Sequence, residues 1–130
     1  MTAGPHQPTK SEELGVIIAS MHEAIPELFG VMIASVDGLP VAHDLLEPDA
    51  ERIAAMAATA LGLGSRITER TNLGRLRETV IRGTQGHLVL CAVGNDAVLV
   101  MSGPLSSNLT LMRIEARVAT VQINTLLGRR

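Results

Sequence analysis

Aromatic side chains are almost absent from this chain of 130 residues, which contains one phenylalanine and no tryptophan or tyrosine. Proteins that stack nucleic-acid bases or hold sugars on flat side chains depend on aromatic rings, so the composition argues against both classes of binding protein. The net charge of −2 is a second argument against nucleic acid, because lysine and arginine side chains that neutralise phosphates drive such binding. We therefore expect no nucleic-acid partner.

Cysteine is equally scarce. The single thiol, Cys91, excludes an internal disulfide and fits a reducing compartment. Residues 1–10 lack the apolar segment of a secretion signal, and no stretch is long and apolar enough to span a membrane. The sequence predicts a cytoplasmic protein without membrane insertion, in which a disordered lead-in over residues 1–10 precedes one domain over residues 11–130.

Motifs for catalysis and cofactor binding are missing too. There is no G-x-x-x-x-G-K-[ST] phosphate loop, and Gly62 and Gly64 lack the third glycine of a dinucleotide-binding loop. The four histidines are scattered, and no pair has the spacing of metal ligands. Cys91 lies in an apolar strand, where a buried structural thiol is more common than a nucleophile. We expect no catalytic residue, metal or cofactor, and no enzyme activity of the chain's own.

Hydrophobic residues, by contrast, make up 46% of the chain, and the mean hydropathy is +0.28. A domain this apolar is expected to cover part of its surface with a partner. The clearest local pattern is a hairpin, in which Asp37 and Gly38 join two apolar runs and tolerate the positive φ angles of a tight turn. Its first strand, 29–36, is apolar enough to be central, whereas Pro40 places the second strand at a sheet edge.

Three helices surround the strands in the predicted order. Apolar spacing and capping signals predict them from Thr9 or Ser11 to Pro26, from Pro48 to about Arg70, and from Ser106, Ser107 or Asn108 to about Leu127. The later strands are 76–82, which is half polar and therefore an edge, and the apolar 88–93 and 97–101. The predicted fold is α+β with the order α-ββ-α-βββ-α, a five-stranded antiparallel sheet in the order 2-1-5-4-3, and helices on both faces.

The second helix has an unusual outward face. Its predicted inner stripe is Ile53, Ala57, Ala60 and Ile67, with Met56 and Leu63 beside it. The outward row holds the small residues Ala55, Ala58 and Gly62. Alanine is a good helix former, which explains part of this row, but small residues also let another helix approach closely, and glycine is costly inside a helix. Arg66 and Arg70 are either a solvated helix end or contacts for an acidic partner or a phosphate.

The order of elements resembles that of the roadblock/dynein light chain family, and most of all the prokaryotic MglB-type proteins that regulate small Ras-like GTPases. The similar segments are 31–41, the alanine-rich 54–64, 87–93, 97–101, and the start of the last helix at Asn108. The resemblance implies a homodimer in which the third strands pair into one continuous sheet and the second helices lie side by side. It also implies that these helices form a platform for the GTPase and activate it by ordering its switch regions, without an arginine finger.

Carried onto this sequence, the resemblance and the patterns above give two predicted surfaces. The predicted dimer interface is Ala55, Ala58, Gly62, Arg77, Thr79 and Ile81. The predicted GTPase surface is Arg52, Thr59, Arg66 and Arg70. The alternative function is a non-catalytic scaffold subunit of a signalling or motor-type assembly with no effect on nucleotide turnover. The sequence leaves open which GTPase is bound, and whether the effect is activation, exchange or tethering.

Overall fold

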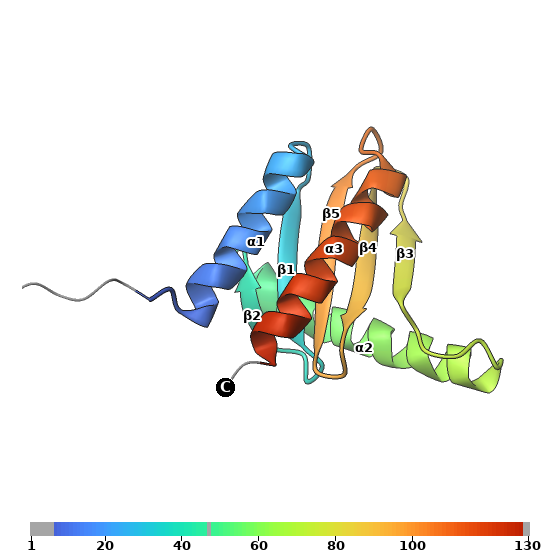
Figure 1. The fold of residues 1–130 in the computed structure, drawn as a ribbon. Coiled ribbons are helices and arrows are strands. Elements are labelled where there is room, and N and C mark those ends of the chain that lie inside the picture. The colour runs from blue at the N-terminus through green and yellow to red at the C-terminus, as the bar shows by residue number, and fades with distance from the viewer. Residues whose placement is uncertain (1–6, 47, 129–130) are drawn as a thin grey trace, which may run out of the picture.

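Five antiparallel strands form one sheet in the order β2-β1-β5-β4-β3, which confirms the predicted topology (Figure 1). The structure is a computed structural model that describes residues 7–46 and 48–128. Most of the predicted disordered lead-in therefore lies outside the described residues. The strands are β1 Gly30–Ser35, β2 Pro40–His43, β3 Glu78–Arg82, β4 Gly86–Val93 and β5 Ala97–Pro104.

Capping side chains set the starts of two of the three helices. Thr9, one of the two candidates, caps α1 (Lys10–Ala24) by accepting a 3.1 Å hydrogen bond from the backbone N–H of Glu12. Asn108, one of three candidates, caps α3 (Leu109–Leu127) through a 3.0 Å bond from the N–H of Leu111. The middle helix, α2 (Asp49–Arg70), begins after Pro48 without a side-chain cap.

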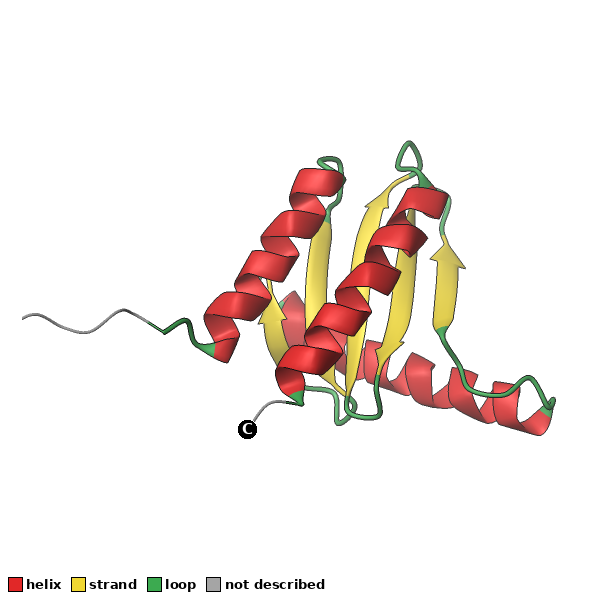
Figure 2. Cartoon of the chain, viewed as in Figure 1, coloured by secondary structure: helices red, strands yellow, loops and turns green. Residues whose placement is uncertain are grey.

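The helices cover the two faces of the sheet unequally (Figure 2). Both α1 and α3 pack on one face, over a core that includes Leu14, Leu99 and Ile123. Of the described helices, α2 alone packs on the other face, over a core built around Met32, Leu90 and Val100. Single-helix coverage of a five-stranded sheet leaves part of that face open.

The path of α2 decides which part stays open. The helix crosses the strands near the end of the sheet that carries the β1–β2 and β4–β5 turns, and its C-terminal part extends past β3 (Figure 1). At the hairpin turn, Gly38 has a φ of 89°, and a Cβ atom there would stand 3.2 Å from the Cα of Ala55. Glycine at this position therefore suits both the backbone conformation and the close approach of α2.

The predicted inner stripe of α2 is wrong in part. The buried residues are Ala50, Ala54, Ala57 and Leu61, while Ile53 and Ala60 are half-buried. Met56, Leu63 and Ile67 are exposed by 59%, 58% and 52%. The helix is rotated relative to the prediction because an alanine stripe lets it lie closer to the sheet than a stripe of larger side chains would.

Candidate partner-binding surface

The sheet face on which α2 packs has a half that α2 leaves uncovered, which we call the open half. One row of residues crosses β1, β5, β4 and β3 there. In the strand register, Gly30 pairs with Ser102, Ser102 with Leu88, and Leu88 with Ile81. Side chains alternate along a strand, so this row faces the same side as the buried Met32 and Leu90 beneath α2. The row borders a hollow of about 300 Å³ that Phe29, Leu88 and other residues line.

Large apolar side chains surround this row. Ile53 lines the hollow, and a Cβ atom on Gly64 would lie near Leu76 and Thr79, so this side of α2 faces the open half of the sheet. Met56 lies one turn after Ile53 and Ile67 one turn after Gly64, while Leu63 lies one turn before Ile67, so these three side chains extend the same side outward. We call the set the open apolar surface, and its members, Leu88 half-buried and the others 48–84% exposed, are Phe29, Leu46, Met56, Leu63, Ile67, Ile81 and Leu88.

The structure divides the residues predicted for the dimer interface into two groups. Thr79 and Ile81 lie on the α2 face of the edge strand, beside the open apolar surface, and Arg77 directly precedes this strand. Ala55 lies against the hairpin turn instead, and Ala58 and Gly62 line a hollow with Val36 and Asn95 at the turn end of the sheet. The small-residue row thus lies on the opposite side of α2 from Met56, Leu63 and Ile67. Its contact with a second copy stays a prediction.

The residues predicted for the GTPase surface are all exposed. Arg52, Thr59, Arg66 and Arg70 follow one another at helical spacing, on the side of α2 opposite its buried alanines. Thr59 uses its hydroxyl to donate a 2.9 Å bond to the carbonyl of Ala55, so the cationic groups are the main polar feature of this ridge. We call these four residues the α2 ridge.

Sequence reasoning missed the exposed position of Met56, Leu63 and Ile67. A signal was present, because Ala50, Ala54, Ala57 and Leu61 have the same helical spacing as the predicted inner stripe. A helix with two apolar stripes can bury only one of them against its own sheet, so the other stripe needs a second contact surface. The second stripe was therefore a candidate contact surface from the sequence alone.

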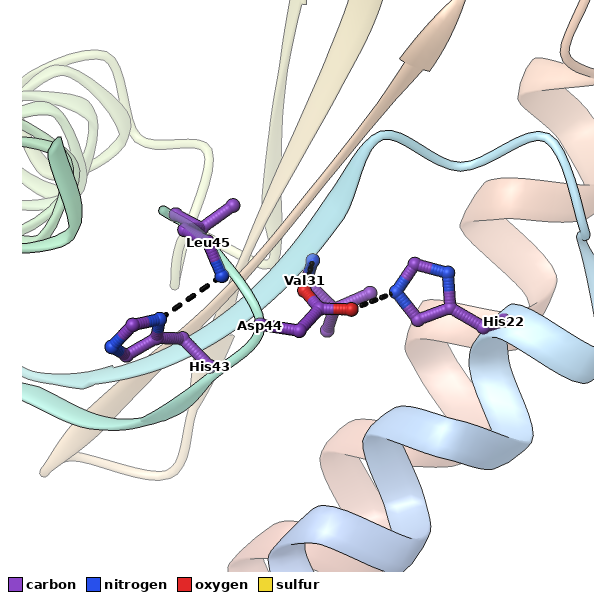
Figure 3. Close-up of polar contacts among 5 residues, drawn as sticks. All are labelled: His22, Val31, His43, Asp44 and Leu45. Atoms are coloured by element: carbon purple, nitrogen blue, oxygen red, sulfur yellow. Dashed lines mark hydrogen bonds and ion pairs between the residues drawn. The ribbon is translucent and has the colours of Figure 1, made fainter. Parts of the chain in front are cut away.

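Polar contacts fix the segment that leads from β2 into α2 (Figure 3). Oδ1 of Asp44 accepts a 2.8 Å hydrogen bond from the backbone N–H of the buried Val31, and Oδ2 contacts Nε2 of His22 on α1. Nδ1 of His43 accepts a 3.0 Å bond from the N–H of Leu45. Through these two contacts the Asp44 carboxylate joins α1 and β1 to the segment that leads into α2.

We find neither a reactive thiol nor a cluster of metal ligands among the described residues. Burial raises the pKa of the Cys91 thiol to about 11, so the thiol is protonated and a poor nucleophile at neutral pH. Among residues 7–46 and 48–128, no three histidine, cysteine, aspartate or glutamate side chains gather as metal ligands would. Within the same residues, no helix has the combination of length and apolar character that crossing a bilayer requires.

Comparison with known proteins gives consistent results for sequence and fold. A model of the Roadblock/LC7 domain family matches residues 11–102. The uncharacterized protein MJ1340 of Methanocaldococcus jannaschii is 33% identical over 98 residues, which is 75% of this chain and 85% of that protein.

Two solved structures extend the likeness over most of the fold. The Roadblock/LC7 domain from Streptomyces avermitilis aligns with a TM-score of 0.82 at 20% identity, over 88% of this chain and 97% of that one. The gliding protein MglB from Thermus thermophilus aligns with a TM-score of 0.83 at 14% identity, over 93% of each chain. At these identities the structural likeness establishes the fold alone.

Proposed function

Because the chain belongs to the Roadblock/LC7 family, we propose that it is a homodimeric regulatory or scaffold partner of a small Ras-like GTPase. The observation that supports this most directly is the open apolar surface, which groups six exposed large apolar side chains around one row of the sheet and lies beside an unpaired sheet edge. The choice of a GTPase as the partner rests on the resemblance of the sequence to the MglB-type regulators of small Ras-like GTPases.

Geometry favours a dimer through β3. Antiparallel pairing of two β3 strands relates the copies by a twofold axis perpendicular to the sheet. Because α2 crosses near one end of its own sheet and extends past β3, this rotation carries the extension onto the open half of the other sheet. Leu63 and Ile67 of one copy then meet the apolar row of the partner. The arrangement also removes the exposed edge, which otherwise favours aggregation.

The α2 ridge is the proposed GTPase surface. In the dimer the two α2 helices lie side by side and present both ridges on the outside of the sheet. The chain has no phosphate-binding loop, so the proposed effect is to hold the switch regions of the GTPase in a competent arrangement, while the GTPase supplies its own phosphate-binding groups.

Single-turnover GTP hydrolysis tests the mechanism. We expect a small Ras-like GTPase from the same genome to hydrolyse GTP faster in the presence of this protein. Arg66→Ala and Arg70→Ala are each expected to weaken the complex by up to about tenfold, which is about 1.4 kcal/mol, with near-normal turnover at saturation. A loss of about 10³-fold at saturation would make that arginine a finger and contradict the mechanism. Binding that leaves hydrolysis unchanged would favour the scaffold alternative.

Gly62→Leu tests the small-residue row separately. A Cβ atom on Gly62 meets nothing within 4 Å, so the monomer should accept leucine and gain up to about 1 kcal/mol from its better helix propensity. We expect the larger side chain to weaken dimerisation or GTPase binding, because it holds an approaching helix away. Melting temperature, dimer dissociation constant and GTPase affinity should be measured together. Higher stability with both affinities unchanged would show that this row contacts no partner.

A further inference from the structure

A cleft lined by arginine side chains lies beside β3 on the α3 side of the sheet. Its volume is about 860 Å³, and its walls come from the end of α2, the segment between α2 and β3, the start of β3, the end of β4 and α3. We call it the arginine cleft, and the charged residues that line it are Arg75, Arg77, Glu78, Arg113 and Arg117.

Positive charge is in excess in this cleft. Nε of Arg113 donates a 2.6 Å hydrogen bond to Oε1 of Glu78, so the one carboxylate of the cleft already has a cationic partner. Within the described residues, no carboxylate forms an ion pair with Arg75, Arg77 or Arg117. Three guanidinium groups therefore remain uncompensated on a concave surface, where the shape of the wall concentrates their field.

The charge of the whole chain is distributed in the same sense. Nine of the thirteen acidic residues precede Arg52, whereas ten of the eleven lysine and arginine residues follow Glu51. The first part of the chain builds α1 and the β2 edge of the sheet, and the last part builds the β3 edge (Figure 1). A net charge of −2 thus conceals an acidic first part and a basic second part of the chain, and every arginine of the cleft belongs to the second part.

We propose that the arginine cleft binds an acidic peptide segment of a partner protein. Arginine forms strong, charge-assisted hydrogen bonds with carboxylates, and clusters of arginine are a recurrent means of recognising acidic motifs. Leu73 and Leu76 also line the cleft and can contact the methylene groups of glutamate side chains. The residues that line the cleft include none of the α2 ridge and none of the open apolar surface, so the proposal goes beyond the GTPase partner.

A peptide fits this cleft better than an isolated phosphate group. Phosphate sites in proteins gather backbone N–H groups at a helix N-terminus or a glycine-rich loop. Here the uncompensated guanidinium groups come from the segment before β3 and from the middle of α3, and the volume far exceeds that of one phosphate. Such a spacing suits an extended segment with several carboxylates.

Fluorescence anisotropy with the full chain tests the proposal. The probe is a labelled peptide with about six glutamate or aspartate residues, and a peptide with glutamine at those positions is its control. We expect saturable binding of the acidic peptide alone, and weaker binding when salt rises from about 50 to about 200 mM. Arg75→Ala/Arg117→Ala should raise the dissociation constant by about tenfold or more. Arg77 is left unchanged because it belongs to the predicted dimer interface.

Lys10→Ala/Arg82→Ala is the matched control, since it removes two exposed positive charges that do not line the cleft. It should leave peptide binding within about twofold of that of the unchanged chain. Equal weakening by both double variants, or absence of saturable binding, would overturn the proposal. Binding of inorganic pyrophosphate without binding of the peptide would overturn it too. Concentration-dependent assembly of the chain that Arg117→Glu abolishes would also overturn the proposal, because a second copy of the chain would then occupy the cleft.

Discussion

Leu63→Asp is expected to convert the homodimer into monomers and to raise the dimer dissociation constant by at least about a hundredfold, which is about 2.8 kcal/mol. Leu63 is 58% exposed in the single chain, so aspartate is solvated there and the fold is preserved. In the proposed dimer the same carboxylate would be buried against the apolar row of the partner, where an unpaired charge is strongly unfavourable. Sedimentation equilibrium at micromolar concentration measures the change, with 13.7 kDa as the mass of the monomer.

Val121→Asp is the matched control for this experiment. Val121 on α3 is 65% exposed and lies on the opposite face of the sheet, away from the proposed interface. The control should therefore dimerise as the unchanged chain does. Loss of dimerisation in Val121→Asp but not in Leu63→Asp would place the interface on the α1 and α3 face, and a monomeric unchanged chain would contradict the dimer itself.

Asp44→Ala is expected to lower the free energy of unfolding by about 2–3 kcal/mol. The substitution leaves the N–H of the buried Val31 without its acceptor, which costs about 1–3 kcal/mol. It also removes the contact with His22, a partly exposed pair whose contribution is at most about 1 kcal/mol. Urea denaturation followed by circular dichroism measures the loss.

Two further variants separate the contributions at this position. Asp44→Asn keeps an oxygen acceptor for Val31 but removes the negative charge, so we expect it to cost less than about 1 kcal/mol. Glu23→Ala removes an exposed carboxylate from α1 and is expected to change stability by no more than about 0.5 kcal/mol. If Asp44→Ala were as mild as Glu23→Ala, Asp44 would not be the acceptor that fixes this segment.

The topology could be predicted because each decisive signal is local. Asp37 and Gly38 fix a turn whose geometry depends on few neighbours, and Pro40 excludes its strand from the interior of a sheet wherever the rest of the chain lies. The apolar runs of β4 and β5 require burial on both faces and therefore central positions. Together these constraints leave few antiparallel orders with short connections.

The orientation of α2 depends on tertiary packing and was predicted less well. Both of its apolar stripes satisfy helical spacing, and the choice between them rests on how closely Ala54 and Ala57 approach the sheet. The contact of Asp44 with Val31 and His22 and the convergence of Arg75 with Arg117 join residues distant in the sequence. No local pattern encodes such contacts, so the Asp44 contacts and the arginine cleft became visible only in the folded chain.

The extension of α2 past β3 also affects local stability. Buried side chains in α2 end at Leu61, and the nine residues that follow include Gly62 and Gly64, which weaken a helix intrinsically. A helical segment with little tertiary burial opens at a free energy well below that of global unfolding, so we expect its amide hydrogens to exchange early with solvent. Arg66 and Arg70 lie on this segment. A second copy or a GTPase that covers it must order it on binding, so affinity at the α2 ridge and helix formation in residues 62–70 are thermodynamically coupled.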